Sequence, residues 1–231
     1  MTIYLYSGTP GSGKSLHATA DIKDAIFWRK HPRPVICNYD LAITGDKRKY
    51  FTYKPNHDLH PQWLVDFSKE WFKSHPFKED RILLVIDECQ LLFNSREWNN
   101  PERMAWLEFF SQHRHYGYKV IFVAQSDKMV DRQFRALIEY DVNHRKLGNF
   151  GFVGAVMSAF FLGRLHVAVT RYYGLSERVG VKWFLARKGI FKLYDSYTSF
   201  ERTSTTVHDG DTEGGAPSRA GVRARRNRRA A

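Results

Sequence analysis

The chain has 231 residues, of which 43% are hydrophobic and 15% aromatic, enough for one sizeable folded core, so a wholly disordered chain is excluded. The formal net charge of +12 favours an acidic partner, either nucleic acid or an anionic membrane surface, with a merely soluble basic protein as the alternative. Two isolated cysteines fit a reducing compartment better than a disulfide framework, and no secretory signal is recognised ahead of the first apolar run.

Apolar runs separated by turn residues predict strands and helices in alternation. In chain order we expect a strand at 3–6, a helix at 15–30, a strand at 34–38, a polar mixed segment at 40–58, a helix at 63–72, a strand at 82–86, a helix at 101–113, a strand at 120–124 and a helix at 131–139. A near-continuous apolar run such as 82–86 is typical of a strand buried on both faces of a parallel sheet. The sequence therefore predicts an α/β fold with a mostly parallel, doubly wound sheet.

The pattern changes after residue 150. Segments 150–161, 165–172 and 190–194 are interpreted as further strands or a late hairpin, and a short helix at 150–163 is the alternative for the first of them. After about residue 200 the composition shifts to Ser, Thr, Gly, Asp and Arg. Seven arginines against four acidic residues leave 201–231 at a net +3, so most of the positive charge lies on 1–200. We expect one folded domain at 1–200 and a disordered basic tail at 201–231.

A glycine-rich segment between the first strand and the first helix matches the G-x-x-x-x-G-K-[ST] pattern in full. Its glycines let backbone N–H groups turn inward toward phosphate oxygens, and the following helix presents its positive end to the same anion. Lys14 is expected to reach the β- and γ-phosphates of ATP, and the Ser15 hydroxyl to hold Mg²⁺. The predicted nucleotide-binding residues are Gly8, Thr9, Pro10, Gly11, Ser12, Gly13, Lys14 and Ser15.

Two carboxylates follow the apolar run at 82–86. Asp87 is expected to hold Mg²⁺, and Glu88 to act as the general base that polarises the attacking water. Ligands of α/β sheets bind at the carboxyl ends of strands, which is where both residues would emerge. A strand followed by an ordinary polar turn is the alternative for this segment.

Three further polar residues are candidates for the same chemistry. Gln125 ends the strand at 120–124 and is predicted to contact the γ-phosphate or orient water, with an ordinary strand-end glutamine equally compatible. Arg114 is predicted to be an arginine finger that acts on the nucleotide of a neighbouring subunit, and Arg96 is the competing candidate. A solvated basic helix end is the alternative for Arg114.

Taken in order, these motifs resemble the N-terminal ATPase domain of the zonular occludens toxin-like (Zot-like) proteins, the assembly ATPases of filamentous phages. The resemblance covers about residues 1–200 and depends on the segments 6–15, 38–39, 85–90, 93–96, 113–117, 124–126 and 191–197. It implies a RecA-like P-loop motor that hydrolyses ATP with Mg²⁺. It also implies a homo-oligomeric ring, a host inner-membrane assembly channel as partner, and phage single-stranded DNA or its coating and capping proteins as cargo.

The expected function is therefore an ATP-driven motor for assembly and export of filamentous phage. A nucleotide-gated binding or regulatory module with little intrinsic hydrolysis is the alternative, and a small-molecule kinase is disfavoured because Glu88 suits activation of water. The uncharged, largely apolar stretch 150–163 has 14 residues, fewer than the ~20 that cross a bilayer as a helix. We accordingly expect a peripheral or cytoplasmic location at the cytoplasmic face of the host inner membrane.

Overall fold

A computed structural model describes residues 2–28, 30–94, 102–146, 165–186, 188–191 and 193. Its strands are β1 (Ile3–Ser7), β2 (Val35–Cys37), β3 (Phe51–Tyr53), β4 (Ile82–Ile86), β5 (Tyr118–Val123), β6 (Tyr140–Lys146), β7 (Leu165–Tyr172) and β8 (Arg178–Leu185). Its α-helices are α1 (Lys14–Lys23), α2 (Pro61–Ser74), α3 (Arg103–Gln112), α4 (Arg132–Arg135) and α6 (Lys188–Phe191). A π-helical turn, Asp24–Trp28, follows α1, and short 3₁₀ turns lie at Gly45–Tyr50, Asn56–Asp58, Cys89–Leu91 and Asp127–Met129.

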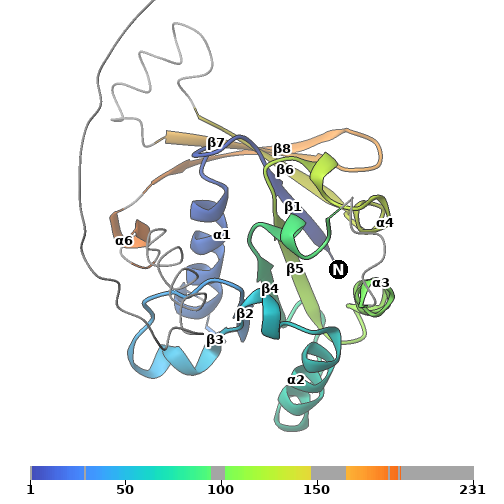
Figure 1. Cartoon of the computed structure of the whole chain (residues 1–231). Coiled ribbons are helices and arrows are strands. Elements are labelled where there is room, and N and C mark those ends of the chain that lie inside the picture. Colours follow the sequence, from blue (N-terminus) through green and yellow to red (C-terminus); the bar gives the residue numbers. More distant parts are fainter. Residues whose placement is uncertain are drawn as a thin grey trace, which may run out of the picture. The chain divides into compact units, whose positions relative to one another are not determined.

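The described strands form one eight-stranded sheet in the order β3-β2-β4-β5-β1-β6-β7-β8. The first six strands in this order run parallel to one another, and β7 and β8 continue the sheet as antiparallel strands. Helix α1 covers one face, and α2, α3 and α4 cover the other (Figure 1). The predicted α/β architecture with a mostly parallel, doubly wound sheet is confirmed.

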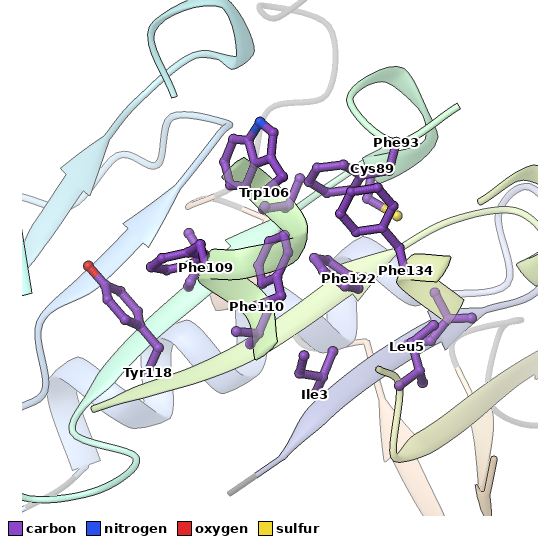
Figure 2. Close-up of a cluster of buried hydrophobic side chains, with 14 of the residues drawn as sticks. Ile3, Leu5, Cys89, Phe93, Trp106, Phe109, Phe110, Tyr118, Phe122 and Phe134 are labelled. Atoms are coloured by element: carbon purple, nitrogen blue, oxygen red, sulfur yellow. The ribbon is translucent and has the colours of Figure 1, made fainter. Parts of the chain in front are cut away.

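Two hydrophobic cores lie on the two faces of this sheet. The face covered by α2, α3 and α4 carries an aromatic cluster in which Phe93 contacts Phe110, Phe122 and Phe134, with ring centroids 4.5–5.5 Å apart (Figure 2). The α1 face packs Ile22 and Ile26 against the alternate side chains of the central strands. Each fully buried side chain of this size stabilises the fold by about 1.5–3 kcal/mol, so the five buried residues of β4 anchor the sheet from both sides.

The helices at 63–72 and 101–113 and the strands at 3–6, 34–38, 82–86, 120–124 and 165–172 are confirmed within a few residues of their predicted ends. The helix predicted at 15–30 is regular only to Lys23 and then widens into the π-helical turn. The helix predicted at 131–139 is wrong beyond residue 135, because the chain straightens there to pair β6 with β1.

Three other expectations were incomplete or wrong. The polar segment 40–58 contains β3, which pairs in parallel with β2. Strands β6 and β8 were not predicted, and the strand predicted at 190–194 is wrong at its start, where α6 packs Ile190 against Leu16 of α1. The predictions for 150–161 and 150–163 and for the tail at 201–231 lie outside the described residues.

The described helices are all short, the longest being α2 with 14 residues. Within the described ranges, none combines the length and the apolar character that a membrane-crossing helix requires.

Candidate functional site

The segment between β1 and α1 is a tight loop whose glycines have little room. Gly8, Gly11 and Gly13 have φ values of 141°, 67° and 95°. A Cβ atom on Gly8 would lie 2.4 Å from the main-chain oxygen of His144, and one on Gly13 would lie 2.9 Å from Nδ1 of His166. Only glycine satisfies both constraints. The loop is therefore a tight backbone turn that leads directly into the N-terminus of α1, as an anion-binding loop requires.

Lys14, the first residue of α1, folds back over the loop. Its Nζ donates hydrogen bonds to the carbonyl oxygens of Gly8 (2.8 Å) and Thr9 (3.2 Å). Burial lowers the pKa of Lys14, and the nearby carboxylates of Glu88 and Asp87 act in the opposite direction. The ammonium group therefore lies between the loop and the carboxylates that follow β4.

Asp87 and Ser15 meet across the carboxyl edge of the sheet. The Ser15 hydroxyl donates a hydrogen bond to the Asp87 carboxylate. Burial raises the pKa of Asp87, which the hydrogen bond from Ser15 partly offsets. This pairing brings together the two residues that the sequence predicted as Mg²⁺ ligands, although 72 positions separate them. Hydroxyl and carboxylate oxygens are ligands that suit Mg²⁺.

Glu88 has an unusual backbone conformation. Its φ of 49° and ψ of 45° are left-handed, which is uncommon for a residue with a Cβ and occurs most often at functional sites. Its N–H donates to Oδ1 of Asp87 at 2.9 Å, and its carboxylate accepts a hydrogen bond from the Gln90 side-chain amide. The general-base candidate is thus held in place by its neighbours on both sides.

Gln125 lies between the two halves of the site. Strand β5 is inserted between β1 and β4, so its end separates the glycine-rich loop from the carboxylates. The Gly8 N–H donates to the Gln125 carbonyl at 3.4 Å, and the Gln125 side chain is exposed at this edge. Its position is compatible with the predicted contact to a γ-phosphate.

Arg114 is not part of this cluster. It precedes β5, whereas the glycine-rich loop and the carboxylates follow their strands, so Arg114 lies at the opposite edge of the sheet. The six residues of β5 set that separation at about 20 Å. Within one subunit, Arg114 therefore lies far from the glycine-rich loop and Lys14. Arg96, the competing finger candidate, lies outside the described residues.

Asn38 belongs to the site, but sequence reasoning gave it no role. Its Oδ1 accepts from the Asp87 N–H, and its Nδ2 donates to the Asp87 carbonyl, both at 2.7 Å. Nδ2 also donates to Oδ1 of Asn56 at 2.7 Å. The signal that could have found it is strand pairing. Cys37 of β2 lies opposite Val85 of β4, so the residue after β2 reaches the residue that follows β4.

The arrangement fits a Mg²⁺-nucleotide. The positive-φ glycines allow the tight turn of the loop, Lys14 supplies a positive charge, and Ser15 with Asp87 supplies an oxygen donor pair. Positioning and charge neutralisation of this kind are what phosphoryl transfer from a nucleoside triphosphate requires.

Comparison with known proteins gives a family match over most of the chain. The family model described as zonular occludens toxin (Zot) matches residues 2–200. The Gene 1 protein of Enterobacteria phage M13 is 31% identical over 214 residues, which cover 87% of this chain and 60% of that relative. The chain thus spans less than two thirds of the length of that relative.

Solved structures show the same fold. The N-terminal domain of zonular occludens toxin from Neisseria meningitidis has a TM-score of 0.51 at 18% identity and covers 84% of this chain and 98% of its own. The DNA-packaging ATPase B204 of Sulfolobus turreted icosahedral virus has a TM-score of 0.50 at 15% identity, covering 79% and 96%. Both likenesses support a P-loop NTPase fold. With the family model matching most of its length, the chain belongs to the zonular occludens toxin (Zot) family.

Proposed function

We propose that this protein is a P-loop ATPase that drives the assembly and export of filamentous phage. The observation that carries the proposal is the contact of Ser15 with Asp87, which joins the glycine-rich loop to the carboxylates of β4 at one edge of the sheet. Its relationship to the M13 Gene 1 protein supports a role in phage production. Export of single-stranded DNA through the host inner membrane is the more specific part of the proposal.

In the proposed reaction the loop N–H groups and Lys14 bind the phosphates of ATP. Ser15 and Asp87 would hold Mg²⁺, which neutralises charge on the β- and γ-phosphates when bound. Glu88 would accept a proton from the attacking water, and Gln125 would contact the γ-phosphate from the end of β5. Lys14 would leave the carbonyls of Gly8 and Thr9 to make its contact with phosphate.

Arg114 would act in trans. Because it lies at the opposite edge of the sheet from its own loop, it meets a nucleotide only if a second subunit presents one there. This supports a homo-oligomeric ring in which Arg114 stabilises the charge that develops on the neighbour's nucleotide. The partners in that assembly would be phage single-stranded DNA, or its coating and capping proteins, and an inner-membrane channel on the cytoplasmic face.

The proposal is tested by phosphate release from the wild type and Glu88→Gln, with and without single-stranded DNA, while oligomer size is followed by light scattering. DNA-stimulated release that Glu88→Gln abolishes, together with an ATP-bound oligomer trapped by this variant, is the expected result. Equal phosphate release by both proteins would refute the role of Glu88. Lys14→Ala is the control that removes nucleotide binding itself.

One observation favours a second candidate, a nucleotide-gated module with little intrinsic hydrolysis. The Gln90 amide donates a hydrogen bond to Oε2 of the Glu88 carboxylate, and a carboxylate stabilised in this way is a weaker base toward the attacking water. ATP binding with no phosphate release, with or without DNA, would favour this candidate.

A further inference from the structure

Two carbonyl groups at the glycine-rich loop, those of Ser12 and of Ser7 just before it, face a wall made by β6 and β7. When the N–H groups of such a loop turn inward, its carbonyl groups turn outward and, where they are buried, need hydrogen-bond donors. The Ser12 carbonyl receives a hydrogen bond from Nδ1 of His166 at 2.9 Å. The carbonyl of Ser7, which leads into the loop, receives one from Nδ1 of His144 at 3.2 Å. Both rings are buried, with 7% and 1% of their surface exposed.

The hydrogen bond to Ser7 fixes the tautomers of a longer chain of groups. A carbonyl can only accept, so His144 carries its proton on Nδ1 and accepts on Nε2. His17 Nδ1 lies 2.9 Å from that Nε2 and therefore donates to it. His17 Nε2 is then an acceptor, and Lys182 Nζ donates to it at 3.0 Å. A directed chain thus runs from the partly exposed Lys182 on β8 to the first carbonyl of the loop.

Neighbouring side chains hold these rings in place. Phe184 of β8 stacks on His17 at 4.8 Å and on His166 at 5.5 Å. Tyr6 of β1 stacks on the other side of His17 at 4.8 Å and donates through its hydroxyl to Asp21 at 2.5 Å. Burial lowers the pKa of His17 and of His144 to about 3, so both rings are neutral near pH 7, as the chain of donors requires.

The wall also touches the loop directly. The main-chain oxygen of His144 lies where a side chain on Gly8 would begin, and the His166 ring lies where one on Gly13 would begin. No gap separates β6 and β7 from the loop at these two points. The loop conformation is therefore determined by these strands as well as by its own glycines.

We propose that His144 and His166 are positioning residues for nucleotide binding: each donates one hydrogen bond to a carbonyl of the loop region and so keeps the loop N–H groups turned toward phosphate. His17 and Lys182 hold His144 in the tautomer that can donate. Lys14 is the exchangeable donor to the loop carbonyls, and the two histidines are the fixed ones. This inference rests on the proposed nucleotide binding. It assigns part of the loop's geometry to β6 and β7, which lie outside the sequence motifs.

The test measures the affinity of the full chain for a fluorescent, slowly hydrolysed ATP analogue with Mg²⁺. His166→Ala removes the donor and is expected to weaken binding about 3- to 10-fold, the effect of one lost hydrogen bond. His166→Asn keeps an N–H at nearly the position of Nδ1 and is expected to restore most of the affinity. His31→Ala, at an exposed position on the opposite edge of the sheet, is the matched control and should bind like the wild type.

Thermal melting of each variant separates positioning from folding. A merely structural role would lower the melting temperature of His166→Ala and His166→Asn alike, and would leave the affinity of the folded fraction unchanged. Should His166→Ala fail to fold, Lys182→Ala and Lys182→Gln replace the pair, because this side chain is 59% exposed. Alanine removes the donor to His17 and is expected to weaken binding, whereas glutamine retains a donor.

Wild-type affinity in His166→Ala would overturn the inference, and so would equally weak binding by His166→Asn and His166→Ala. The second outcome would assign the effect to packing of the imidazole ring. If the wild type itself does not bind the analogue, the proposed function fails as well, and the wild-type titration alone reveals it.

Discussion

Replacing Asn38 tests whether the carboxylate loop is held from the neighbouring strand. Asn38→Ala leaves the main-chain N–H and carbonyl of Asp87 without the two 2.7 Å hydrogen bonds that they form with this side chain. Each lost hydrogen bond is worth about 1–1.5 kcal/mol at a half-buried position, so the free energy of unfolding should fall by about 2–3 kcal/mol. For a domain of this size that corresponds to a melting temperature lower by about 5–10 °C.

The same change should weaken Mg²⁺-dependent nucleotide binding. A ligand that loses the partner orienting it typically loses about 10- to 100-fold in metal affinity. Titration of the ATP analogue at several Mg²⁺ concentrations measures this effect, and urea unfolding measures stability. Asn38→Asp is the matched variant, because it keeps the acceptor for the Asp87 N–H and loses the donor to the Asp87 carbonyl. Lower stability with an unchanged Mg²⁺ requirement would refute the positioning of Asp87 by Asn38.

Three further changes have defined outcomes. Gly8→Ala places a Cβ 2.4 Å from a main-chain oxygen and should lower the free energy of unfolding in urea by about 3 kcal/mol or more. Gly45→Ala, also at positive φ but with nothing within 4 Å, should lower it by about 1 kcal/mol. Equal losses in the two variants would contradict the steric argument. Burial lowers the pKa of His144 to about 3, whereas its ring titrates near 6.5 in the unfolded chain, so between pH 7 and pH 5 the unfolded chain binds a proton that the folded chain does not. His144 alone should therefore lower the free energy of unfolding by about 2 kcal/mol over this range, and His144→Asn should reduce the loss by that amount. Gln90→Ala frees the Glu88 carboxylate and should raise the rate of phosphate release if that hydrogen bond restrains hydrolysis; an unchanged or lower rate would contradict the restraint.

The parts of the site that could be predicted are those encoded in contiguous segments. Gly8 to Ser15 lies in one unbroken pattern, and Asp87 follows an apolar run that reads as a buried strand without any tertiary information. Their meeting follows from one general rule, because the carboxyl ends of parallel strands share an edge of the sheet. The contact between Ser15 and Asp87 therefore needed no knowledge of strand order.

The parts that could not be predicted depend on strand order. His144 contacts residues 127 and 137 positions away, and its strand β6 alternates buried Val142 with polar residues in a way that reads as a loop. Strand β8 contains Gly180 and exposes much of its length, which weakens the strand signal. Asn38 follows a strand of only three residues, and its contact with Asp87 can be inferred only when β2 is known to pair with β4.

The order of the strands also explains where the supporting residues come from. The glycine-rich loop follows β1 and the carboxylates follow β4, and β5 separates them. Each half is held from its outer neighbour: β6 holds the loop through His144, and β2 holds Asp87 through Asn38. Neither supporting strand lies between the two halves, where only β5 and Gln125 intervene. Strand β5 pairs with both β1 and β4, so the sheet sets the distance between the loop and the carboxylates, and Gln125 at the end of β5 stays the predicted contact to the γ-phosphate.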